Sequence, residues 1–518
     1  MPTLTIDGRS YTFEDGLTIL QACKSVGIWI PHFCYYPKLS ITGSCRMCLV
    51  EVEKAPTLQI SCYTPIRDGM VVHTASERVK KARKGILEFL LINHPLDCPI
   101  CDQAGECPLQ MITMKWGPDR SRFEEEKKHA AKRTEIGPHI IYDAERCIKC
   151  TRCVRFCDEV THTGELGLFE RGDSAVIGTF NGKSLSNDYS LCTVDICPVG
   201  ALTSREFRFK NRVWFMKDTK SVCPECSRGC STTLWTNMKH EVQRMTPRRN
   251  DNVNDSWMCD EGRLSYMNWD PGARLRRAAV RNGAPEEITV DAALERAAEA
   301  IRAAVKAHGP GSVGAWASAF ATNEELYLLG QLTDRVEVLP ARDGRGDDIL
   351  KRADKSPNRR GAHAVLKSAS LAQDIESGKV KVLVAMKPRG TAELPANPKA
   401  LQKLDALIVI DSEKNQLAEM ATHTLPAAMY VEDEGTWVNE FGWVQRFEAA
   451  RPAPADACPA WQLLARLLWL ARDAKWSFQS PAQVFEALAR ENAAFAGMSY
   501  AKLGDAGLRL AGTEGPSR

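Results

Sequence analysis

The chain has 518 residues, with 68 basic against 65 acidic side chains and a net charge of +3. Apolar residues make up 44% and charged residues 26%, which excludes a disordered chain and indicates several folded domains. The near balance of charge gives no reason to expect nucleic acid or an anionic membrane surface as the main partner.

Two further classes are disfavoured by the pattern of apolar residues. No stretch reaches the roughly 18 to 20 uninterrupted apolar residues that a membrane-spanning helix needs. The N-terminus lacks a basic region followed by an apolar run, so we expect no secretory signal. The sequence therefore predicts a chain that stays in the reducing cytoplasm, where structural disulfides are rare.

The first predicted domain, residues 1–78, is a small β-rich unit. Residues 4–6 and 10–13 form a predicted hairpin around Asp7-Gly8, a favoured two-residue turn. A short helix is predicted over 17–26 and a strand over 48–52. An amphipathic helix over 77–91 is expected to end before the Asn-His-Pro sequence at 93–95.

The remaining segments divide by composition. We predict further domains over 79–118, 137–215, 216–272 and 273–518, with a charged, solvated connector at 119–135. After residue 272 the chain becomes Ala-, Leu- and Arg-rich, which favours an α/β domain. In it, residues 380–385 and 406–410 read as buried parallel strands and 292–308 and 460–473 as helices. Residues 339–361 and 500–518 are predicted to be a loop and a loose tail.

The cysteines are the strongest functional signal. There are 19, of which eighteen precede residue 260 and only Cys458 follows it. This density in a chain expected to remain in a reducing compartment indicates metal binding. Sixteen positions form four candidate ligand groups, while Cys23 and Cys458 have no metal-like context.

The first group consists of Cys34, Cys45, Cys48 and Cys62. Four thiolates can hold two irons bridged by sulfide, and the small residues at 43–44 allow backbone N–H groups to approach the sulfurs. The ten-residue first spacing differs from the four residues of plant-type ferredoxins, which indicates a relative of that fold. A zinc site is the alternative, because four cysteines also complete a tetrahedron.

The second group consists of His94, Cys98, Cys101 and Cys107. Three cysteines leave one ligand position of a four-iron cluster open, and an imidazole can fill it. On spacing alone, His94 could equally be a helix-end residue. A neutral imidazole in place of a thiolate would make the site less negative and raise its reduction potential.

The third group consists of Cys147, Cys150, Cys153 and the distant Cys197, which precedes a proline. Three closely spaced cysteines plus a distant Cys-Pro are typical of a four-iron ferredoxin site. Cys157 is a competing fourth ligand by spacing, but Asp158 rather than proline follows it. We interpret Cys157 and Cys192 as small buried residues.

The fourth group consists of Cys223, Cys226, Cys230 and Cys259. Its spacing resembles the four-iron motif at the start of molybdopterin-dependent oxidoreductases. All four ligand positions are present, so we expect a cluster here.

Taken in order, these groups resemble the large iron–sulfur subunit of bacterial NADH:quinone oxidoreductase (respiratory complex I). The segments 171–173 and 195–203 support the resemblance, which is specific over residues 1 to about 270. It implies an N-terminal ferredoxin-like β-grasp, two further cluster-binding modules and a degenerate molybdopterin-oxidoreductase-like α/β domain, in a multidomain α+β and α/β chain. It also implies that His94 is a cluster ligand.

The second half distinguishes an electron carrier from a catalyst. Segments 322–325, 424–427 and 434–439 resemble a shortened molybdopterin-oxidoreductase domain. Formate dehydrogenases of that fold place a cysteine or selenocysteine on the metal, whereas no cysteine lies between Cys259 and Cys458. Asp260 also stands where those enzymes tend to have a lysine directed to the pterin. We therefore expect one 2Fe-2S cluster, three 4Fe-4S clusters and no molybdopterin.

The resemblance implies electron transport from a flavin- and NADH-binding partner subunit towards quinone, within the peripheral arm of a proton-translocating oxidoreductase on the cytoplasmic side of the inner membrane. Electrons would pass from the second group to the third, with the two-iron cluster on the same route and the fourth group to the side. No glycine-rich phosphate loop or catalytic triad stands out. Two alternatives remain: the cluster-bearing subunit of an NAD-linked hydrogenase or formate dehydrogenase, and a zinc-stabilised scaffold without redox activity.

Overall fold

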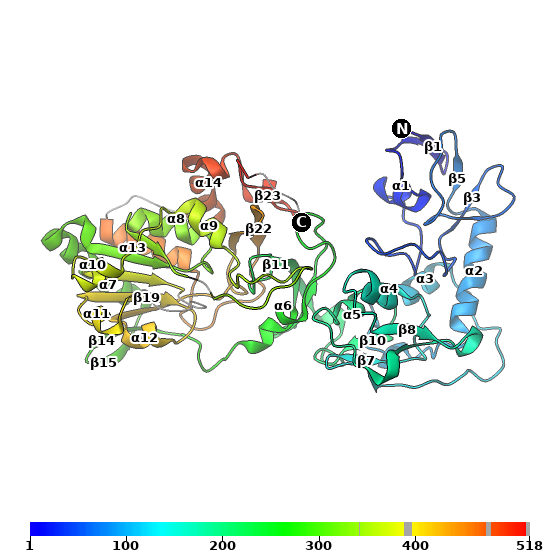
Figure 1. Cartoon of the computed structure of the whole chain (residues 1–518), viewed down its shortest axis with the longest axis horizontal. Helices are drawn as coiled ribbons and strands as arrows, with labels where there is room; N and C mark the ends of the chain where they lie inside the picture. The colour runs from blue at the N-terminus through cyan, green and yellow to red at the C-terminus, as the bar shows by residue number, and fades with distance from the viewer. Residues whose placement is uncertain (341, 388–395, 473–477, 514–518) are drawn as a thin grey trace. The chain divides into compact units, whose positions relative to one another are not determined.

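The computed structural model describes residues 1–340, 342–387, 396–472 and 478–513. The chain forms two compact units, Met1–Phe215 and Met216–Arg518. Figure 1 draws the first in blue to blue-green and the second in green to red. The finer division into five domains stays a prediction.

The N-terminal part of the first unit is a five-stranded sheet with the strand order β2-β1-β5-β3-β4. Its elements are β1 (Thr3–Ile6), β2 (Arg9–Thr12), α1 (Ile19–Ser25), β3 (Leu49–Val52), β4 (Gln59–Ile60) and β5 (Val71–His73). The predicted hairpin is confirmed, with Asp7 and Gly8 at φ values of 46° and 82° in its turn. β1 and β5 pair in parallel and the other pairs are antiparallel. This mixed sheet and its helix form the expected ferredoxin-like β-grasp.

The rest of the first unit consists of short elements joined by long connections. They are α2 (Glu77–Leu91), α3 (Pro108–Trp116), β6 (Thr134–Glu135), β7 (Ile140–Tyr142), α4 (Arg152–Glu159), β8 (Leu166–Phe169), β9 (Val176–Thr179), α5 (Cys192–Ile196) and β10 (Leu202–Ser204). The predicted helix over 77–91 is confirmed, and the Ser76 hydroxyl caps it by accepting from the Val79 N–H at 3.3 Å. Several buried apolar side chains of this part, such as Leu185 and Tyr189, lie in the connections between these elements.

The second unit opens with the antiparallel strands β11 (Lys217–Val222), β12 (Ser231–Thr236) and β13 (Val242–Pro247), followed by α6 (Asp260–Leu264). A seven-stranded sheet follows, in the order β15-β14-β20-β19-β18-β16-β17. Its strands are β14 (Ala278–Asn282), β15 (Ala284–Ile288), β16 (Val313–Ala317), β17 (Val336–Val338), β18 (Val382–Met386), β19 (Ala406–Asp411) and β20 (His423–Pro426). The five strands from β16 to β20 are parallel, which confirms the two predicted parallel strands.

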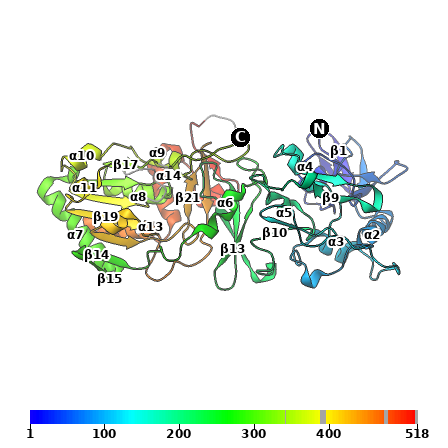
Figure 2. The same cartoon turned by 60° about the horizontal axis from the view of Figure 1, so that its bottom comes forward.

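Helices cover both faces of this sheet, as Figure 2 shows for the second unit. One layer contains α7 (Val290–His308), α8 (Asn323–Leu332), α9 (Arg359–Val365), α13 (Ala460–Arg472) and α14 (Pro481–Glu491). The other contains α10 (Ala372–Glu376), α11 (Pro398–Leu401) and α12 (Gln416–Met420). Alternate residues of β18 face the two layers: Val384 packs with the first and Leu383 with the second. Because both faces are covered there, β16 and β18 consist of buried apolar residues throughout.

The end of the chain is more ordered than predicted. A third sheet joins β21 (Gly435–Val438), β22 (Trp443–Phe447) and β23 (Leu508–Arg509). The prediction of a loose tail is therefore wrong over residues 500–513, because α15 (Tyr500–Leu503) and β23 pack there and Leu510 is buried. Residues 473 and 514–518, the ends of the predicted last helix and tail, lie outside the described residues. No helix within the described ranges has the length and apolar character needed to cross a membrane.

Candidate metal centres

The first cysteine group lies in the loops of the β-grasp sheet. Cys34 and Cys45 belong to the connection after α1, Cys48 precedes β3 and Cys62 follows β4. The Cys34 N–H donates to Cys45 Sγ at 3.4 Å, and the Cys34 thiol also contacts that of Cys62. Hydrogen bonds from the Cys45 and Cys62 thiols lower the pKa of Cys34, and a Cys62–Cys48 thiol contact lowers that of Cys48. The loops thus bring all four predicted sulfurs together.

The second group occupies the connection between α2 and α3. Cys101 and Cys107 are buried, and Cys107 directly precedes the first turn of α3. A Cβ placed on Gly200 would lie 2.3 Å from Cys101 Sγ, so only glycine permits this close approach of the backbone to the sulfur. Cys107 Sγ lies 3.7 Å from the carbonyl oxygen of Pro198. The second group is therefore packed against the residues that follow Cys197 of the third.

His94 has the properties of a neutral metal ligand. Its Nδ1 is buried and has no hydrogen-bond partner. Burial lowers the pKa of His94 to about 4, so the ring is uncharged at neutral pH and keeps a lone pair for a metal. Lys127 fixes the backbone beside it, because Lys127 Nζ donates to the carbonyl oxygens of Leu91, Ile92 and His94 at 2.7–2.9 Å. The description of 119–135 as a purely solvated connector is thus wrong at Lys127.

The third group lines a hollow bordered by β7, β9, the start of α4 and the segment 197–202. Cys147, Cys150, Cys153 and Cys197 all border it, together with apolar side chains such as Val199. Burial raises the pKa of the Cys150 and Cys197 thiols to about 11, so bound cations would be needed to keep them as thiolates. Cys157 and Cys192 are fully buried and are not among the residues that line this hollow.

The fourth group lines a small hollow in the second unit. Cys223 and Cys230 lie at the facing ends of β11 and β12, where the Cys223 N–H donates to the Cys230 carbonyl oxygen at 2.9 Å. Cys226 lies between them, and Cys259 caps α6. A Cβ on Gly262 would lie 2.9 Å from Cys223 Sγ and 3.4 Å from Cys259 Sγ. The backbone thus comes as close to these sulfurs as glycine allows.

Two lysines that could not be identified from the sequence border this fourth site. Lys351 and Lys355 border the hollow and pair with Glu261 at 3.0 Å and 3.2 Å. They come from the predicted loop 339–361, where nothing in the local sequence marks them as neighbours of cysteines 92 or more residues earlier. Two ammonium groups partly compensate the negative charge that four thiolates would bring.

The donor sets fit iron–sulfur clusters, because thiols of the third and fourth groups face a shared hollow and Gly200 and Gly262 let the backbone approach sulfurs of the second and fourth. Within the described ranges, no three or more His, Cys, Asp or Glu side chains are arranged to hold a single metal ion.

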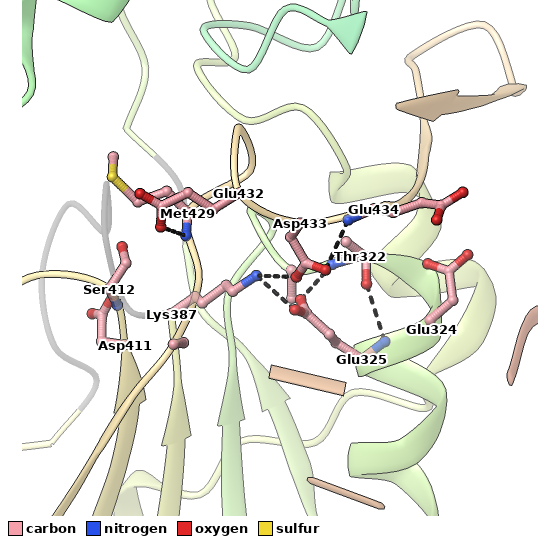
Figure 3. A network of polar contacts seen from close by, with 12 residues as sticks. Thr322, Glu324, Glu325, Lys387, Asp411, Ser412, Met429, Glu432, Asp433 and Glu434 are labelled. Carbon is pink, nitrogen blue, oxygen red and sulfur yellow. Dashed lines mark hydrogen bonds and ion pairs between the residues drawn. The ribbon is translucent and has the colours of Figure 1, made fainter. Parts of the chain in front are cut away.

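A different cluster of polar side chains lies at the carboxyl ends of β16, β18 and β19, where open α/β sheets bind ligands. Lys387, directly after β18, places its Nζ 2.6 Å from Glu325 Oε1 and 4.0 Å from Asp433 Oδ2, as Figure 3 shows. Burial alone would lower the pKa of Lys387, but the Glu325 and Asp433 carboxyl groups reverse this and raise it. Burial also raises the pKa of Asp411, at the end of β19, to about 6.

This cluster does not fit a phosphate-bearing cofactor. Its described side chains supply one lysine among several carboxyl groups, including Glu324, whose pKa burial raises to about 7. Lys387 is already paired, so it has no free charge for an anionic phosphate. Lys387 and Glu325 therefore neutralise each other at this edge of the sheet.

Comparison with known proteins covers most of the chain in four parts. Residues 1–77 match the 2Fe-2S iron-sulfur cluster binding domain, and residues 83–122 the NADH-ubiquinone oxidoreductase-G iron-sulfur binding region. Residues 137–203 match the NADH-quinone oxidoreductase subunit 3 ferredoxin-like domain, and residues 353–469 the molybdopterin oxidoreductase family.

The individual relatives include subunits of NADH-quinone and NADH-ubiquinone oxidoreductases and a chain of a hydrogenase. An NADH-quinone oxidoreductase subunit of Rickettsia bellii is 39% identical over 336 residues, which are 65% of this chain and 48% of the relative. The mitochondrial NADH-ubiquinone oxidoreductase 78 kDa subunit of Neurospora crassa is 39% identical over 404 residues, 75% of this chain and 52% of the relative. A solved chain of an NAD⁺-reducing NiFe hydrogenase is 31% identical, with 41% of this chain and 91% of that chain covered at a TM-score of 0.37.

The cysteine-lined sites and the matched domains together define a multidomain iron–sulfur protein. More specifically, the chain belongs to the family that contains this bacterial NADH-quinone oxidoreductase subunit and the mitochondrial 78 kDa subunits. It spans about half the length of the curated relatives it matches.

Proposed function

We propose that this chain is an electron-transfer subunit of NADH:quinone oxidoreductase that passes single electrons from a flavoprotein subunit towards quinone. The names of its relatives support this reaction, and the four cysteine-rich sites supply the required donor sets. Iron–sulfur clusters, when bound, supply reversible one-electron oxidation and reduction. The protein's own contribution is to hold each cluster, exclude water and set its potential through charge and hydrogen bonds.

The ligand assignment follows the four groups. A 2Fe-2S cluster would be held by the first group, and 4Fe-4S clusters by each of the other three. The full set is Cys34, Cys45, Cys48, Cys62, His94, Cys98, Cys101, Cys107, Cys147, Cys150, Cys153, Cys197, Cys223, Cys226, Cys230 and Cys259. The buried, unpartnered Nδ1 of His94 supports its inclusion, because such an atom would otherwise lack any compensation for burial.

The implied partners are the flavin- and NADH-binding subunit and other peripheral-arm subunits, on the cytoplasmic side of the inner membrane. The absence of a glycine-rich phosphate loop from the sequence supports a nucleotide site on another chain. We further propose that the C-terminal domain holds no molybdopterin, because the ion pair of Lys387 and Glu325 occupies its ligand-binding edge. Molybdenum at one equivalent per purified chain would refute this.

The observation that carries the proposal is that four thiols border one hollow in each of the third and fourth groups, and that the thiols of the first group contact one another. The test is EPR of the anaerobically purified, reduced protein, with iron and sulfide counted on the same sample. About fourteen irons per chain are expected, with one two-iron and several four-iron signals.

Variants of the fourth group sharpen this test. Cys226→Ala should remove one four-iron signal and lower the count to about ten irons. Cys458→Ala is the matched control, because Cys458 lies outside all four groups and should change neither quantity. Zinc in place of iron would establish the scaffold alternative instead. Hydrogen- or formate-dependent reduction of the assembled complex would favour the two other oxidoreductase alternatives.

A further inference from the structure

Helix α4 connects the first and third cysteine groups through two arginines. Arg152 Nη2 donates to the carbonyl oxygen of Tyr35, the residue after Cys34, at 2.7 Å. Its Nη1 donates to the carbonyl oxygen of Ile196, the residue before Cys197, at 3.0 Å. One guanidinium therefore spans two sites that are far apart in the sequence.

Arg155, one turn further along α4, also connects the two groups, and it contacts the backbone of the proposed ligands directly. Its Nη2 donates to the carbonyl oxygen of Cys34 at 2.6 Å and to that of Cys150 at 3.4 Å. Its Nη1 also donates to the carbonyl oxygen of Ser40. The planar guanidinium holds these acceptors in a fixed geometry, which a flexible ammonium group could not do equally well.

The same helix binds the loop after Cys34 at a third point. The Glu159 carboxylate accepts from the Ser40 N–H at 2.7 Å and from its hydroxyl. Three side chains of one helix thus hold the loop that carries Cys34, and the first turn of that helix carries Cys153. The two sites are therefore linked by side-chain hydrogen bonds within the first unit.

Both arginines are buried, with exposed fractions of 8% for Arg152 and 6% for Arg155. The hydrogen bonds to the carbonyl oxygens of Cys34, Cys150, Tyr35 and Ile196 place both guanidinium charges beside ligands of the two groups. Each electron added to a cluster makes the site more negative, so a fixed positive charge nearby favours the reduced state.

We propose that Arg152 and Arg155 form an arginine bridge that fixes the spacing of the first and third cluster sites and raises the reduction potentials of both. The two arginines are positioning residues, since they act through charge and through backbone carbonyls rather than by binding iron. This inference rests on the proposed function, because it requires that both groups hold redox-active clusters.

The test compares charge with geometry in the full-length protein. Arg152→Gln removes the charge, so EPR-monitored redox titration should show a lower potential for both the two-iron signal and the third-group four-iron signal. A tenfold change in the reduction equilibrium, which is about 59 mV for a one-electron couple, is the expected scale. Arg152→Lys keeps the charge but cannot donate to both carbonyls equally well. It should restore most of the potential while changing the magnetic interaction between the two clusters.

The matched control is Arg83→Gln. Arg83 lies in α2, is also buried, and donates from its guanidinium to the carbonyl oxygen of Leu49 in the β-grasp sheet at 3.0 Å. Its replacement should leave the third-group potential unchanged, although it lies near Cys48 and can shift that of the first group. Arg155→Gln should resemble Arg152→Gln.

The outcomes separate the inference from the proposed function. If the wild-type protein carries both clusters but Arg152→Gln and Arg155→Gln leave both potentials and the magnetic interaction unchanged, the arginine bridge is refuted and the proposed function stands. If the wild-type protein carries no iron–sulfur clusters, the proposed function falls and the bridge falls with it. If Arg155→Gln does not fold, the Arg152→Lys and Arg152→Gln pair still decides between charge and packing.

Discussion

The third cysteine group and the carboxyl edge of the seven-stranded sheet differ in how their buried polar side chains are compensated. In the third group, four thiols face a shared hollow, and the pKa of Cys150 and Cys197 is raised by burial. At the sheet edge, Lys387 and Glu325 face each other and leave no unpaired charge between them. The thiols of the third group need a bound cation to be stable as thiolates, whereas the charges at the sheet edge are neutralised by the protein's own side chains.

This contrast predicts that substitutions in the two regions change different properties of the protein. A change at a cysteine group should act on metal content and redox signals. A change at the sheet edge should act on folding stability and leave the clusters of the first unit in place.

The largest expected effect is loss of a whole cluster in Gly200→Ala. The added methyl group would lie 2.3 Å from Cys101 Sγ, and the obstruction cannot be relieved without moving a ligand of the second group. We expect the iron content to fall by about four per chain, with the two-iron EPR signal retained. The control is Gly85→Ala in α2, where the new methyl group meets nothing within 4 Å and should leave the iron content unchanged. Full iron content in Gly200→Ala would contradict the tight packing of this backbone against the sulfur.

The sheet edge should respond through stability when its cation is removed. Lys387→Met leaves the buried carboxyl groups of Glu325 and Asp433 without their positive partner. Breaking a buried pair in this way should lower the free energy of unfolding of the second unit by about 3–5 kcal/mol. Denaturant titration followed by tryptophan fluorescence measures this, and the first-unit EPR signals should persist.

A surface lysine provides the control for that loss. Lys379 is 71% exposed and lies 3.4 Å from Asp374. Lys379→Met should change the free energy of unfolding by no more than about 0.5 kcal/mol, because exposed ion pairs contribute little. Equal losses in the two variants would show that the buried pair has no special role.

The sequence was informative where interactions are local. The close cysteine spacings and the bounds of the helix over 77–91 depend on residues within a few positions of each other, so spacing and periodicity suffice to find them. Long-range contacts were missed. Lys127 reaches back 33 to 36 residues to the end of α2, and Arg152 reaches Tyr35 across 117 residues. No local pattern distinguishes these cations from others in the same charged segments.

The end of the chain shows the same limit. The segment 500–513 is short and rich in glycine, which is typical of a loose tail. They are ordered because β23 pairs with β22 and because Tyr500 Oη donates to the buried Glu324 at 2.8 Å. Partners supplied by another part of the fold therefore outweigh the local composition.

Glu324 also gives the sheet edge a pH dependence. Burial raises its pKa from the usual 4.5 to about 7, so the folded protein holds a proton that the unfolded chain releases between these pH values. The stability of the second unit should therefore fall as pH rises from about 4.5 to 7 and then level off, by roughly 3 kcal/mol from this group. Glu324→Gln removes the titration, so the difference between wild type and variant should shrink or reverse over that range. A difference that is constant from about pH 5 to 8 would mean that Glu324 is ionised in the folded protein.

The smallest effects should come from two helix caps that compare the units directly. Thr18 caps α1 in the first unit and Thr322 caps α8 at the sheet edge, and each forms a reciprocal capping box with the residue three positions later. Replacing a capping threonine by alanine costs about 1 kcal/mol. In α8 the partner is Glu325, which also pairs with Lys387, whereas in α1 the partner is the neutral Gln21. Thr322→Ala should therefore cost more than Thr18→Ala, measured by denaturant titration. In a Lys387→Met background, Thr322→Ala should lower the free energy of unfolding by no more than Thr18→Ala does, because the cap would no longer orient a paired charge.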